Sequence, residues 1–276
     1  MGDGYPAALT ELLAVTDDEF TAMPLAYGGR MYGGETAARA LAAAQRTVPP
    51  DRAAHVVRCD YLRPGDPSEP LRLRVHRLRD GRAFSVRRVD VEQRERVIFT
   101  ATTSFHAGAS AFGHHDPMPE VPAPEELGEL TVCRGEQFIW PDWLVGHPGL
   151  DVRPVPDRSG APPDLRAAWY RVTAPITDSP DLHACLWLYA SDLSLVASIR
   201  LPHEPTARKS WLMTSLNHTV WLHRPFRVDE WVLMVQSSPV AGDGRGLAQG
   251  RVFTRAGELV STATQEGLAT AISVTV

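Results

Sequence analysis

Residues 33–45 read Gly-Gly-Glu-Thr-Ala-Ala-Arg-Ala-Leu-Ala-Ala-Ala-Gln, a run dominated by alanine. Alanine is the best helix former, so the stretch from Glu35 to Gln45 predicts a helix. Because its side chains are small and apolar nearly all round, this helix should be buried and close to its neighbours. Proline cannot continue a helix, which places the end near Val48-Pro49-Pro50. We therefore expect one buried helix near the start of the chain.

A different periodicity follows this helix. In Phe84-Ser85-Val86-Arg87-Arg88-Val89, apolar and polar side chains alternate at almost every residue, as a half-buried strand requires. Turn sequences such as Arg63-Pro64-Gly65-Asp66-Pro67 and Asp80-Gly81 separate the strand-like segments. The predicted strands cover residues 55–62, 71–79, 83–91 and 97–105. The first half of the chain is therefore predicted to be one helix followed by an antiparallel meander.

The second half repeats this plan. A mostly apolar helix is predicted over residues 180–193, with Ser179 or Asp178 as its N-cap and Pro180 at its first position. Strand-like segments follow it at residues 212–222, 231–238, 246–254 and 258–267.

Single residues also repeat between the halves. His55 and His218 lie 163 positions apart, and so do Gly81 and Gly244, each of which begins a Gly-Arg pair. A fixed offset along a chain indicates internal duplication. The sequence therefore predicts an α+β fold of two tandem units. Two further pairs at nearly equal offsets are Arg63-Pro64 with Arg224-Pro225, and Ala101-Thr102 with Ala263-Thr264.

The stretch between the units is rich in Pro, Glu, His and Gly. It includes Pro117-Met118-Pro119-Glu120-Val121-Pro122 and is typical of an extended linker. A long polar loop within one domain has the same composition, but the position at mid-chain favours a linker. The expected organisation is an N-terminal unit at 1–109, a linker at 110–130 and a C-terminal unit at 131–276.

Composition excludes several classes of protein. The net charge of −5 and the isoelectric point near 6.1 argue against a nucleic-acid binder. Cys59, Cys133 and Cys185 lack metal-ligand spacing and are typical of free thiols in a reducing compartment, so no metal site is expected. No apolar run approaches the ~20 residues of a membrane span, and the N-terminus lacks the features of a signal peptide. A cytoplasmic protein with no membrane partner is expected.

Several separated motifs occur in a fixed order along nearly the whole chain. Together they resemble the acyl-CoA thioesterase II family, the double hot-dog thioesterases. The resemblance implies that each sheet wraps around its own central helix. It also implies hydrolysis of fatty acyl-CoA to free acid and CoA without metal, cofactor or covalent intermediate, by a homo-oligomer that is a dimer or a tetramer. The motifs are Tyr32-Gly33-Gly34, Tyr61-Leu62-Arg63-Pro64-Gly65-Asp66, residues 78–89, Val152-Arg153-Pro154-Val155, Tyr189-Ala190-Ser191-Asp192, His223-Arg224-Pro225-Phe226 and Gln265-Glu266-Gly267.

The resemblance also implies a catalytic trio, which falls here on Asp192, Ser215 and Gln265. The chain departs from the family pattern at three nearby positions. Glu35 stands where the family commonly has Gln, Ser215 where Thr is more frequent, and Asn217 where Asp is common. None of these departures removes a catalytic functional group, but each bears on substrate choice.

Thioester hydrolysis requires an oriented water, a proton acceptor and stabilisation of an oxyanion. Asp192 can accept the proton, and its place near the C-terminal end of a predicted helix faces the negative end of the helix dipole, which makes it a better base. Ser215 and Gln265 each offer a donor and an acceptor to the water. Backbone N–H groups near Gly33 and Gly34 can bind the oxyanion, with Glu35 as a neighbour of the substrate.

Other interpretations stay open at this stage. A hot-dog enoyl-CoA hydratase would need an Asp-x-Asn-x-x-x-x-His pattern, which the chain lacks. A non-catalytic acyl-CoA binding protein would keep the cleft and tolerate loss of Asp192. His55 and His218 suggest a Ser–His pair, but no Gly-x-Ser-x-Gly elbow accompanies them, which favours a structural role. The basic segment 200–209 is a candidate contact for the CoA phosphates.

Overall fold

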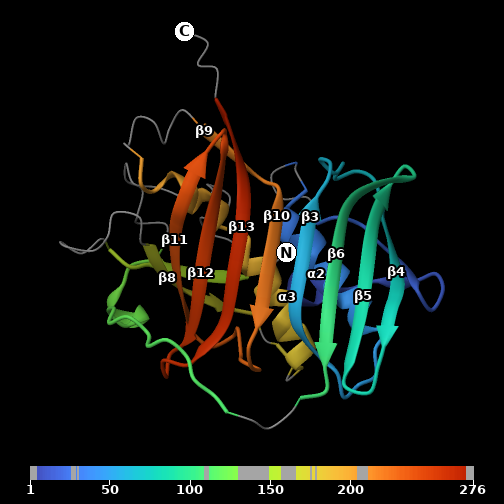
Figure 1. The fold of residues 1–276 in the computed structure, drawn as a ribbon, viewed down its shortest axis with the longest axis horizontal. Helices are drawn as coiled ribbons and strands as arrows, with labels where there is room; N and C mark the ends of the chain where they lie inside the picture. Colours follow the sequence, from blue (N-terminus) through green and yellow to red (C-terminus); the bar gives the residue numbers. More distant parts are fainter. Residues whose placement is uncertain are drawn as a thin grey trace.

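The computed structural model describes residues 5–25, 29, 31–108, 112–129, 149–156, 166–174, 176–177, 179–203 and 211–271. Figure 1 shows their strands as one broad sheet in front of two central helices. The first half contains α1 (Tyr5–Thr10), β1 (Leu13–Ala14), β2 (Glu19–Ala22), α2 (Gly33–Gln45), β3 (Ala53–Tyr61), β4 (Leu71–Asp80), β5 (Phe84–Gln93) and β6 (Arg96–His106). The second half contains η1 (Pro124–Glu126), β7 (Leu150–Pro154), β8 (Arg166–Val172), α3 (Pro180–Ser191), η4 (Val196–Arg200), β9 (Trp211–Ser215), β10 (Asn217–Leu222), β11 (Val232–Gly242), β12 (Arg245–Thr254) and β13 (Leu259–Ala271).

The two halves share a single antiparallel sheet. Its described strands follow the order β1-β2-β4-β5-β6-β3-β10-β13-β12-β11-β8-β7, and β9 also pairs with β13. The junction is the antiparallel pair of β3 and β10, in which Val57 lies opposite Val220. The fold has the predicted helix-and-sheet unit twice, and the backbone hydrogen bonds of this junction make the two half-sheets continuous.

Both predicted central helices are present. Helix α2 is buried from Gly34 to Ala44, as its alanine-rich sequence indicates. Helix α3 begins at Pro180, and Ser179 is its N-cap, accepting a hydrogen bond from the N–H of Leu182. That contact decides between the two N-cap candidates, because a side-chain oxygen at this position satisfies a free N–H of the first turn.

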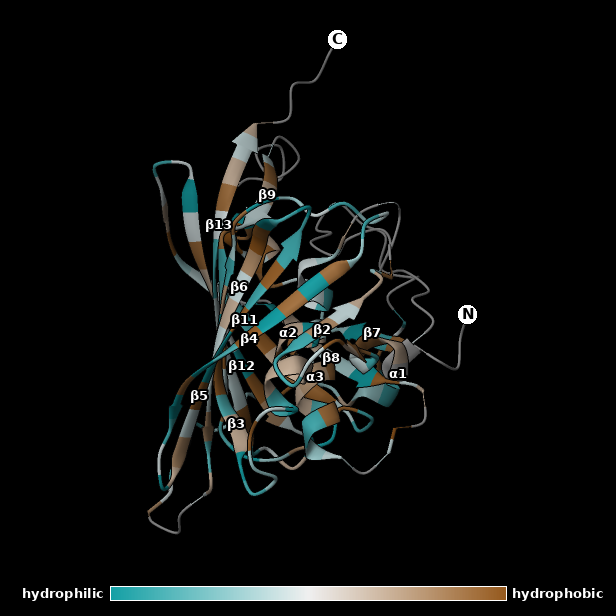
Figure 2. Cartoon of the chain, turned by 90° about the vertical axis from the view of Figure 1, so that its right-hand side faces the viewer, coloured by the Kyte–Doolittle hydropathy of each residue, from teal (hydrophilic) through white to brown (hydrophobic). Residues whose placement is uncertain are grey.

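The two helices lie side by side and antiparallel on the same face of the sheet (Figure 2). At one end, the Tyr32 hydroxyl donates to the carbonyl oxygen of Tyr189 at 2.8 Å. At the other end, Gln45 Nε2 donates to the carbonyl oxygen of Asp181 at 3.2 Å. The start of α2 therefore meets the end of α3, which is the arrangement that builds the site described below.

The strands predicted after each central helix are present, and one of them differs from its prediction in a way that affects the candidate site. The predicted strand 212–222 is two strands, because Leu216 interrupts it between β9 and β10. Strand β11 also runs on to Gly242, beyond the predicted end at residue 238, through an irregularity between Ser237 and Val240.

The described part of the predicted linker packs on the second half of the molecule. Trp169 Nε1 donates to the carbonyl oxygen of Pro122 at 3.0 Å, and Arg153 Nη1 donates to that of Pro124 at 2.7 Å. Met118, Val121 and Leu127 lie against an apolar cluster on the outer face of the sheet. Residues 112–129 therefore cover apolar surface there, whereas Cys133 and the rest of 130–148 lie outside the described residues.

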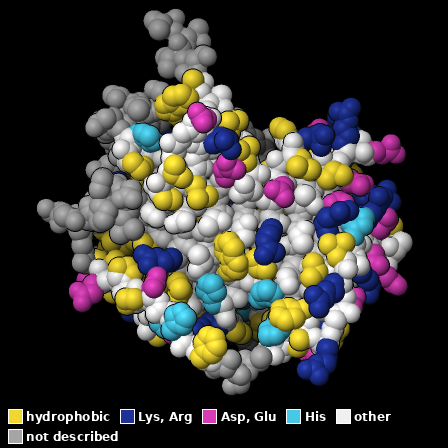
Figure 3. All heavy atoms as spheres, in the orientation of Figure 1, with side chains coloured by type: hydrophobic (Ala, Val, Ile, Leu, Met, Phe, Trp, Pro, Cys, Tyr) yellow, Lys and Arg dark blue, Asp and Glu magenta, His cyan; other side chains and the backbone are white. Residues whose placement is uncertain are grey.

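Charged side chains gather on the strands of the first half that lie toward the right in Figure 3. Arg72 and Arg74 both bind the Glu19 carboxylate, at 2.8 and 3.1 Å, and Arg77 binds Asp18 at 2.8 Å. Pairs of this kind are exposed and add little stability each. Their charge discourages another strand from pairing with this side of the sheet.

One described segment, Pro180–Arg200, is long and apolar enough to cross a membrane by length and composition alone. In the folded chain 83% of its most apolar window is buried inside the protein. The sequence expectation that no run approaches this length was therefore too strict, since α3 and η4 follow one another directly in the core.

Replacing Gly34 with Ala is expected to destabilise the fold by about 1–3 kcal/mol, the cost typical of overpacking. The new methyl group would lie 2.7 Å from the Tyr189 carbonyl oxygen and 2.6 Å from the Tyr32 ring. Urea denaturation measures the change. Gly113→Ala is the matched control because a methyl group there meets nothing within 4 Å. Equal stability of the two variants would contradict the tight contact between α2 and α3.

Candidate active site

Asp192 lies where the two central helices meet. It is the C-cap of α3, and its side chain is buried. A methyl group built on Gly33, the first residue of α2, would lie 3.1 Å from Asp192 Oδ2. The carboxylate therefore stands between the negative end of α3 and the positive end of α2. Only the first of these two dipoles is evident from the sequence.

Gln265 joins Asp192 to Ser215. Its side chain is fully buried on β13, and Nε2 donates to Asp192 Oδ1 at 2.5 Å and to Ser215 Oγ at 2.9 Å. A carboxylate can only accept, so Asp192 determines which end of the amide faces it. The structure therefore brings the three predicted residues together in one connected group.

The interruption at Leu216 is what turns Ser215 toward this group. Side chains alternate between the two faces of a strand, so an unbroken strand with His218 buried would point Ser215 outward. Ser215 instead lies opposite Gly267 on β13, while Leu216 donates its N–H to the Glu266 carbonyl oxygen at 2.9 Å. The extra residue acts as a β-bulge and re-aims one side chain.

Asp192 and Ser215 line a cleft of about 550 Å³ to which both halves of the chain contribute, and Gln265 is buried in contact with both of them. The first half contributes Gly33 and Thr36 of α2, Tyr61 at the end of β3, and the turn that follows it. The second half contributes Asp192, Ser215 and an apolar wall that includes Val196. This volume is within the range of small-molecule sites.

Comparisons with known proteins match both halves. Residues 21–106 match the family model "Acyl-CoA thioesterase N-terminal domain", and residues 157–268 match "Acyl-CoA thioesterase". Acyl-coenzyme A thioesterase 8 of Rattus norvegicus is 34% identical over 256 residues, which cover 87% of this chain and 80% of that protein. Acyl-CoA thioesterase 2 of Haemophilus influenzae is 32% identical over 249 residues, which cover 87% of each chain. The chain belongs to the acyl-CoA thioesterase II family.

Solved structures agree with this assignment. The crystal structure of acyl-CoA thioesterase II TesB2 from Mycobacterium marinum superposes with a TM-score of 0.84 at 35% identity, covering 97% of this chain and 99% of that one. The protein is therefore an acyl-CoA thioester hydrolase with the double hot-dog fold. A dehydratase domain of PpsC from Mycobacterium tuberculosis superposes with a TM-score of 0.56 at 16% identity, which shows a shared fold alone.

The three residues expected around the oxyanion do not share one environment. Gly33 lines the thioesterase cleft, whereas Gly34 packs against α3. Glu35 turns toward the N-terminal segment, where Oε1 accepts from Arg39 Nε at 2.9 Å and from the N–H of Leu25 at 2.8 Å. Burial raises the pKa of Glu35, and the Arg39 charge opposes that effect. Successive helix residues point in different directions, so a run of three cannot face one cleft.

His218 is buried behind the trio. Its Nε2 lies 2.9 Å from the Oγ of Ser191, the residue before Asp192. Burial lowers the pKa of His218, against the opposing influence of Asp192 and of the backbone of Thr264, the residue before Gln265. This hydrogen bond ties the imidazole to the segment that carries Asp192, and both partners are buried, which supports a structural role over a catalytic Ser–His pair.

The sheet register corrects one landmark of the duplication. Thr102 pairs with Arg58, and Thr264 pairs with Thr219, so these are equivalent positions. Counting back from Arg58 and Thr219, His218 corresponds to Val57 and not to His55. Each half has a strand irregularity close to these positions, between Ala54 and Val56 in the first half and at Leu216 in the second. His55 corresponds to Leu216, the bulge itself. The other landmarks keep their places at matching turns and strands.

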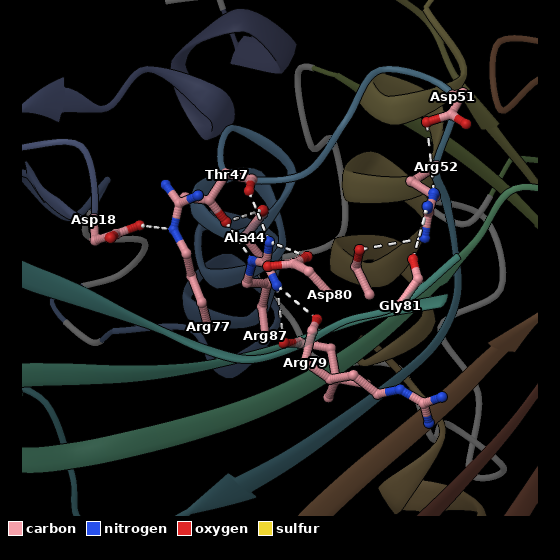
Figure 4. A network of polar contacts seen from close by, with 12 residues as sticks. Asp18, Ala44, Thr47, Asp51, Arg52, Arg77, Arg79, Asp80, Gly81 and Arg87 are labelled. Carbon is pink, nitrogen blue, oxygen red and sulfur yellow. Dashed lines mark hydrogen bonds and ion pairs between the residues drawn. The ribbon is translucent and has the colours of Figure 1, made fainter. Parts of the chain in front are cut away.

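The same register shows what the first half carries at the trio positions. Ala54 corresponds to Ser215, Thr103 corresponds to Gln265, and the C-cap of α2 is Arg46 where that of α3 is Asp192. A network around Arg87 holds the end of α2 (Figure 4). Arg87 Nη2 donates to the carbonyl oxygen of Thr47 at 2.9 Å and to Asp80 Oδ1 at 2.7 Å. This end of the first unit is occupied by structural hydrogen bonds.

Tyr61 is a residue of the cleft that sequence reasoning did not single out. It lies in one of the motifs that carry the family resemblance, but the resemblance implies no role for it. Its hydroxyl lies next to Asp192, and burial, together with the charge of that carboxylate, raises the pKa of Tyr61 well above its usual range. The contact is between residues far apart in sequence, so no local pattern could indicate it.

The stability of the fold should decrease as pH falls from about 6.5 toward 5. The pKa of His218 is lowered in the folded chain, so the unfolded chain binds more protons in this window and protonation favours unfolding. Burial lowers the pKa of His55 and His223 as well, with the same sign. Urea denaturation at pH 7.5, 6.5 and 5.5 measures the slope, and His218→Gln should make it shallower. An unchanged slope in that variant would mean that His218 is not the buried neutral group described.

Proposed function

We propose that Asp192, Ser215 and Gln265 hydrolyse fatty acyl-CoA by activating and orienting one water molecule. The observation that carries this proposal is the position of Gln265, whose amide binds both Asp192 and Ser215 at the cleft. Gln265 Oε1 is buried and has no partner among the residues that the structure describes. A buried acceptor of this kind is available to a hydrogen of the attacking water.

The proposed reaction has two steps. Asp192 takes a proton from the water as the water oxygen bonds to the thioester carbon, and the carbonyl oxygen becomes an oxyanion. Free N–H groups at the start of α2 stabilise that charge, and Gly33 keeps the approach open because it has no side chain. The carbon–sulfur bond then breaks, and the proton on Asp192 passes to the departing CoA sulfur. Water is the only co-reactant, so the reaction requires no metal or cofactor.

A fatty acyl group is the substrate that the cleft walls favour. The second half lines the cleft with the apolar residues Leu193, Val196 and Met213, and the first half lines it with Met31, Ile98 and Phe99. Arg63 lies at the same cleft and is a candidate contact for the CoA phosphates. Residues 204–210 of the predicted basic segment lie outside the described residues.

We further propose that the enzyme has two joined units, forms an oligomer and acts in the cytoplasm. The family matches over 21–106 and 157–268 support two units joined by the stretch 110–130. The open face of the sheet, away from α2 and α3, offers a surface on which a dimer or tetramer can form (Figure 2). Cys59 and Cys185 are buried free thiols, which is consistent with the reducing cytoplasm.

Asp192→Asn is expected to lower kcat by about 10²- to 10⁴-fold, the usual contribution of a general base, with KM changed only a few-fold. CoA release from a panel of acyl-CoAs of increasing chain length, followed with a thiol reagent, measures both constants. A variant as fast as the parent would contradict the role of Asp192. A parent chain that binds the panel but releases no CoA would indicate the non-catalytic binding protein instead.

Ser215→Ala is expected to lower kcat about fivefold, since one hydrogen bond is worth about 1 kcal/mol. Ser215→Thr keeps the hydroxyl and suits a strand, so its kcat should stay within a few-fold of the parent. The pair separates loss of the hydroxyl from a change of shape. If both variants lose activity equally, the role of the hydroxyl in orienting water is wrong.

A further inference from the structure

Tyr61 stands where the two halves of the chain meet. It is the last residue of β3, and its N–H donates to the carbonyl oxygen of Leu216, the bulge beside Ser215, at 2.9 Å. Its ring packs against Phe99 with 5.3 Å between ring centroids. The first half of the sheet and the bulge of the second therefore hold this side chain in one position.

The Tyr61 hydroxyl is buried beside the Asp192 carboxylate, but within the described part of the chain it makes no hydrogen bond of regular geometry. The hydroxyls of two other tyrosines in the interior have partners. The Tyr32 hydroxyl donates to the carbonyl oxygen of Tyr189, and the Tyr170 hydroxyl lies 2.7 Å from Ser194 Oγ. An unsatisfied buried hydroxyl costs about 1–3 kcal/mol, so a fold that retains one calls for an explanation.

The space beside this hydroxyl suits the carbonyl group of the substrate. A methyl group on Gly33 would lie 2.7 Å from the Tyr61 ring and 3.1 Å from Asp192 Oδ2, so the absence of a side chain there keeps open the space between them. The proposed attack of water places the substrate carbonyl beside Asp192 and the start of α2. That carbonyl oxygen is an acceptor, and Tyr61 is the buried donor beside it.

We propose that Tyr61 is a further catalytic residue, whose hydroxyl donates a hydrogen bond to the thioester carbonyl oxygen and to the oxyanion formed from it. The inference rests on the proposed function of Asp192 and extends it to the first unit, which then contributes a catalytic side chain as well as Gly33. The high pKa of Tyr61 keeps the hydroxyl protonated, so it is a donor throughout the working range of pH.

Tyr61→Phe tests this assignment because it removes one oxygen and leaves the ring against Phe99. Loss of one oxyanion donor typically lowers kcat by about 10²- to 10³-fold, and we expect a fall of that order with KM changed only a few-fold. The melting temperature should stay the same or rise, because a buried unsatisfied oxygen has been removed.

Tyr170→Phe is the matched control. It removes a buried hydroxyl that has partners, Ser194 and Gln236, in the second half. This variant should have a lower melting temperature and a kcat within about threefold of the parent.

An S-alkyl-CoA, which has a methylene group in place of the carbonyl, provides a second measurement. Tyr61→Phe should leave the Kd of this thioether unchanged, because the hydroxyl has no oxygen to bind in it. A weaker Kd would overturn the assignment, since it would show that Tyr61 shapes the cleft and does not act on the carbonyl.

Two kinetic outcomes would also overturn the proposal. One is a kcat of Tyr61→Phe within threefold of the parent. The other is an unchanged kcat plateau with a shifted acid limb of the pH profile, which would mean that the hydroxyl acts on Asp192. Asp192→Asn measured in the same assay separates the two proposals, because a slow Asp192→Asn beside a fast Tyr61→Phe contradicts only the role of Tyr61.

Discussion

The antiparallel pairing of β3 with β10 is the constraint on which the rest of the structure depends. This pairing brings the two units edge to edge, so that α2 and α3 lie antiparallel on one face of a single sheet. The start of α2 then meets the end of α3. Only in that arrangement do the free N–H groups at the start of α2 come close to the carboxylate of Asp192 at the end of α3. Neither unit alone would hold both.

The two units share a similar backbone arrangement, as expected for a duplication, but they carry different side chains at equivalent positions. The second unit has Asp192, Ser215 and Gln265 at positions where the first has Arg46, Ala54 and Thr103. The first unit uses buried arginine contacts to secure the end of its helix, as the network around Arg87 shows (Figure 4). It also provides Gly33 and Tyr61 to the cleft between the units. The proposed active site therefore includes residues of both units, even though its trio comes from one copy.

Much of this could be predicted from periodicity and from the family resemblance. The alanine-rich run of α2, the Ser179-Pro180 start of α3 and most strand positions follow from local propensities. The trio itself was predicted from the family resemblance. The chemistry of the three side chains is compatible with that prediction but does not require it. Ser215 illustrates the difference, because its inward direction depends on a one-residue bulge at Leu216 that no alternation pattern indicates. Glu35 was expected beside the substrate, but its carboxylate turns away and binds Arg39 instead.

The sequence by itself determined the two central helices and most of the strands that follow them, that the plan occurs twice, and which family the chain resembles. These properties depend on residues close together in the chain or on repeated spacing. Only the tertiary structure decided that the two half-sheets are continuous, that Gly33 faces Asp192 and that Tyr61 carries a buried free hydroxyl beside them. Such contacts join residues more than a hundred positions apart, and their geometry depends on helix packing and strand register, which local sequence does not encode.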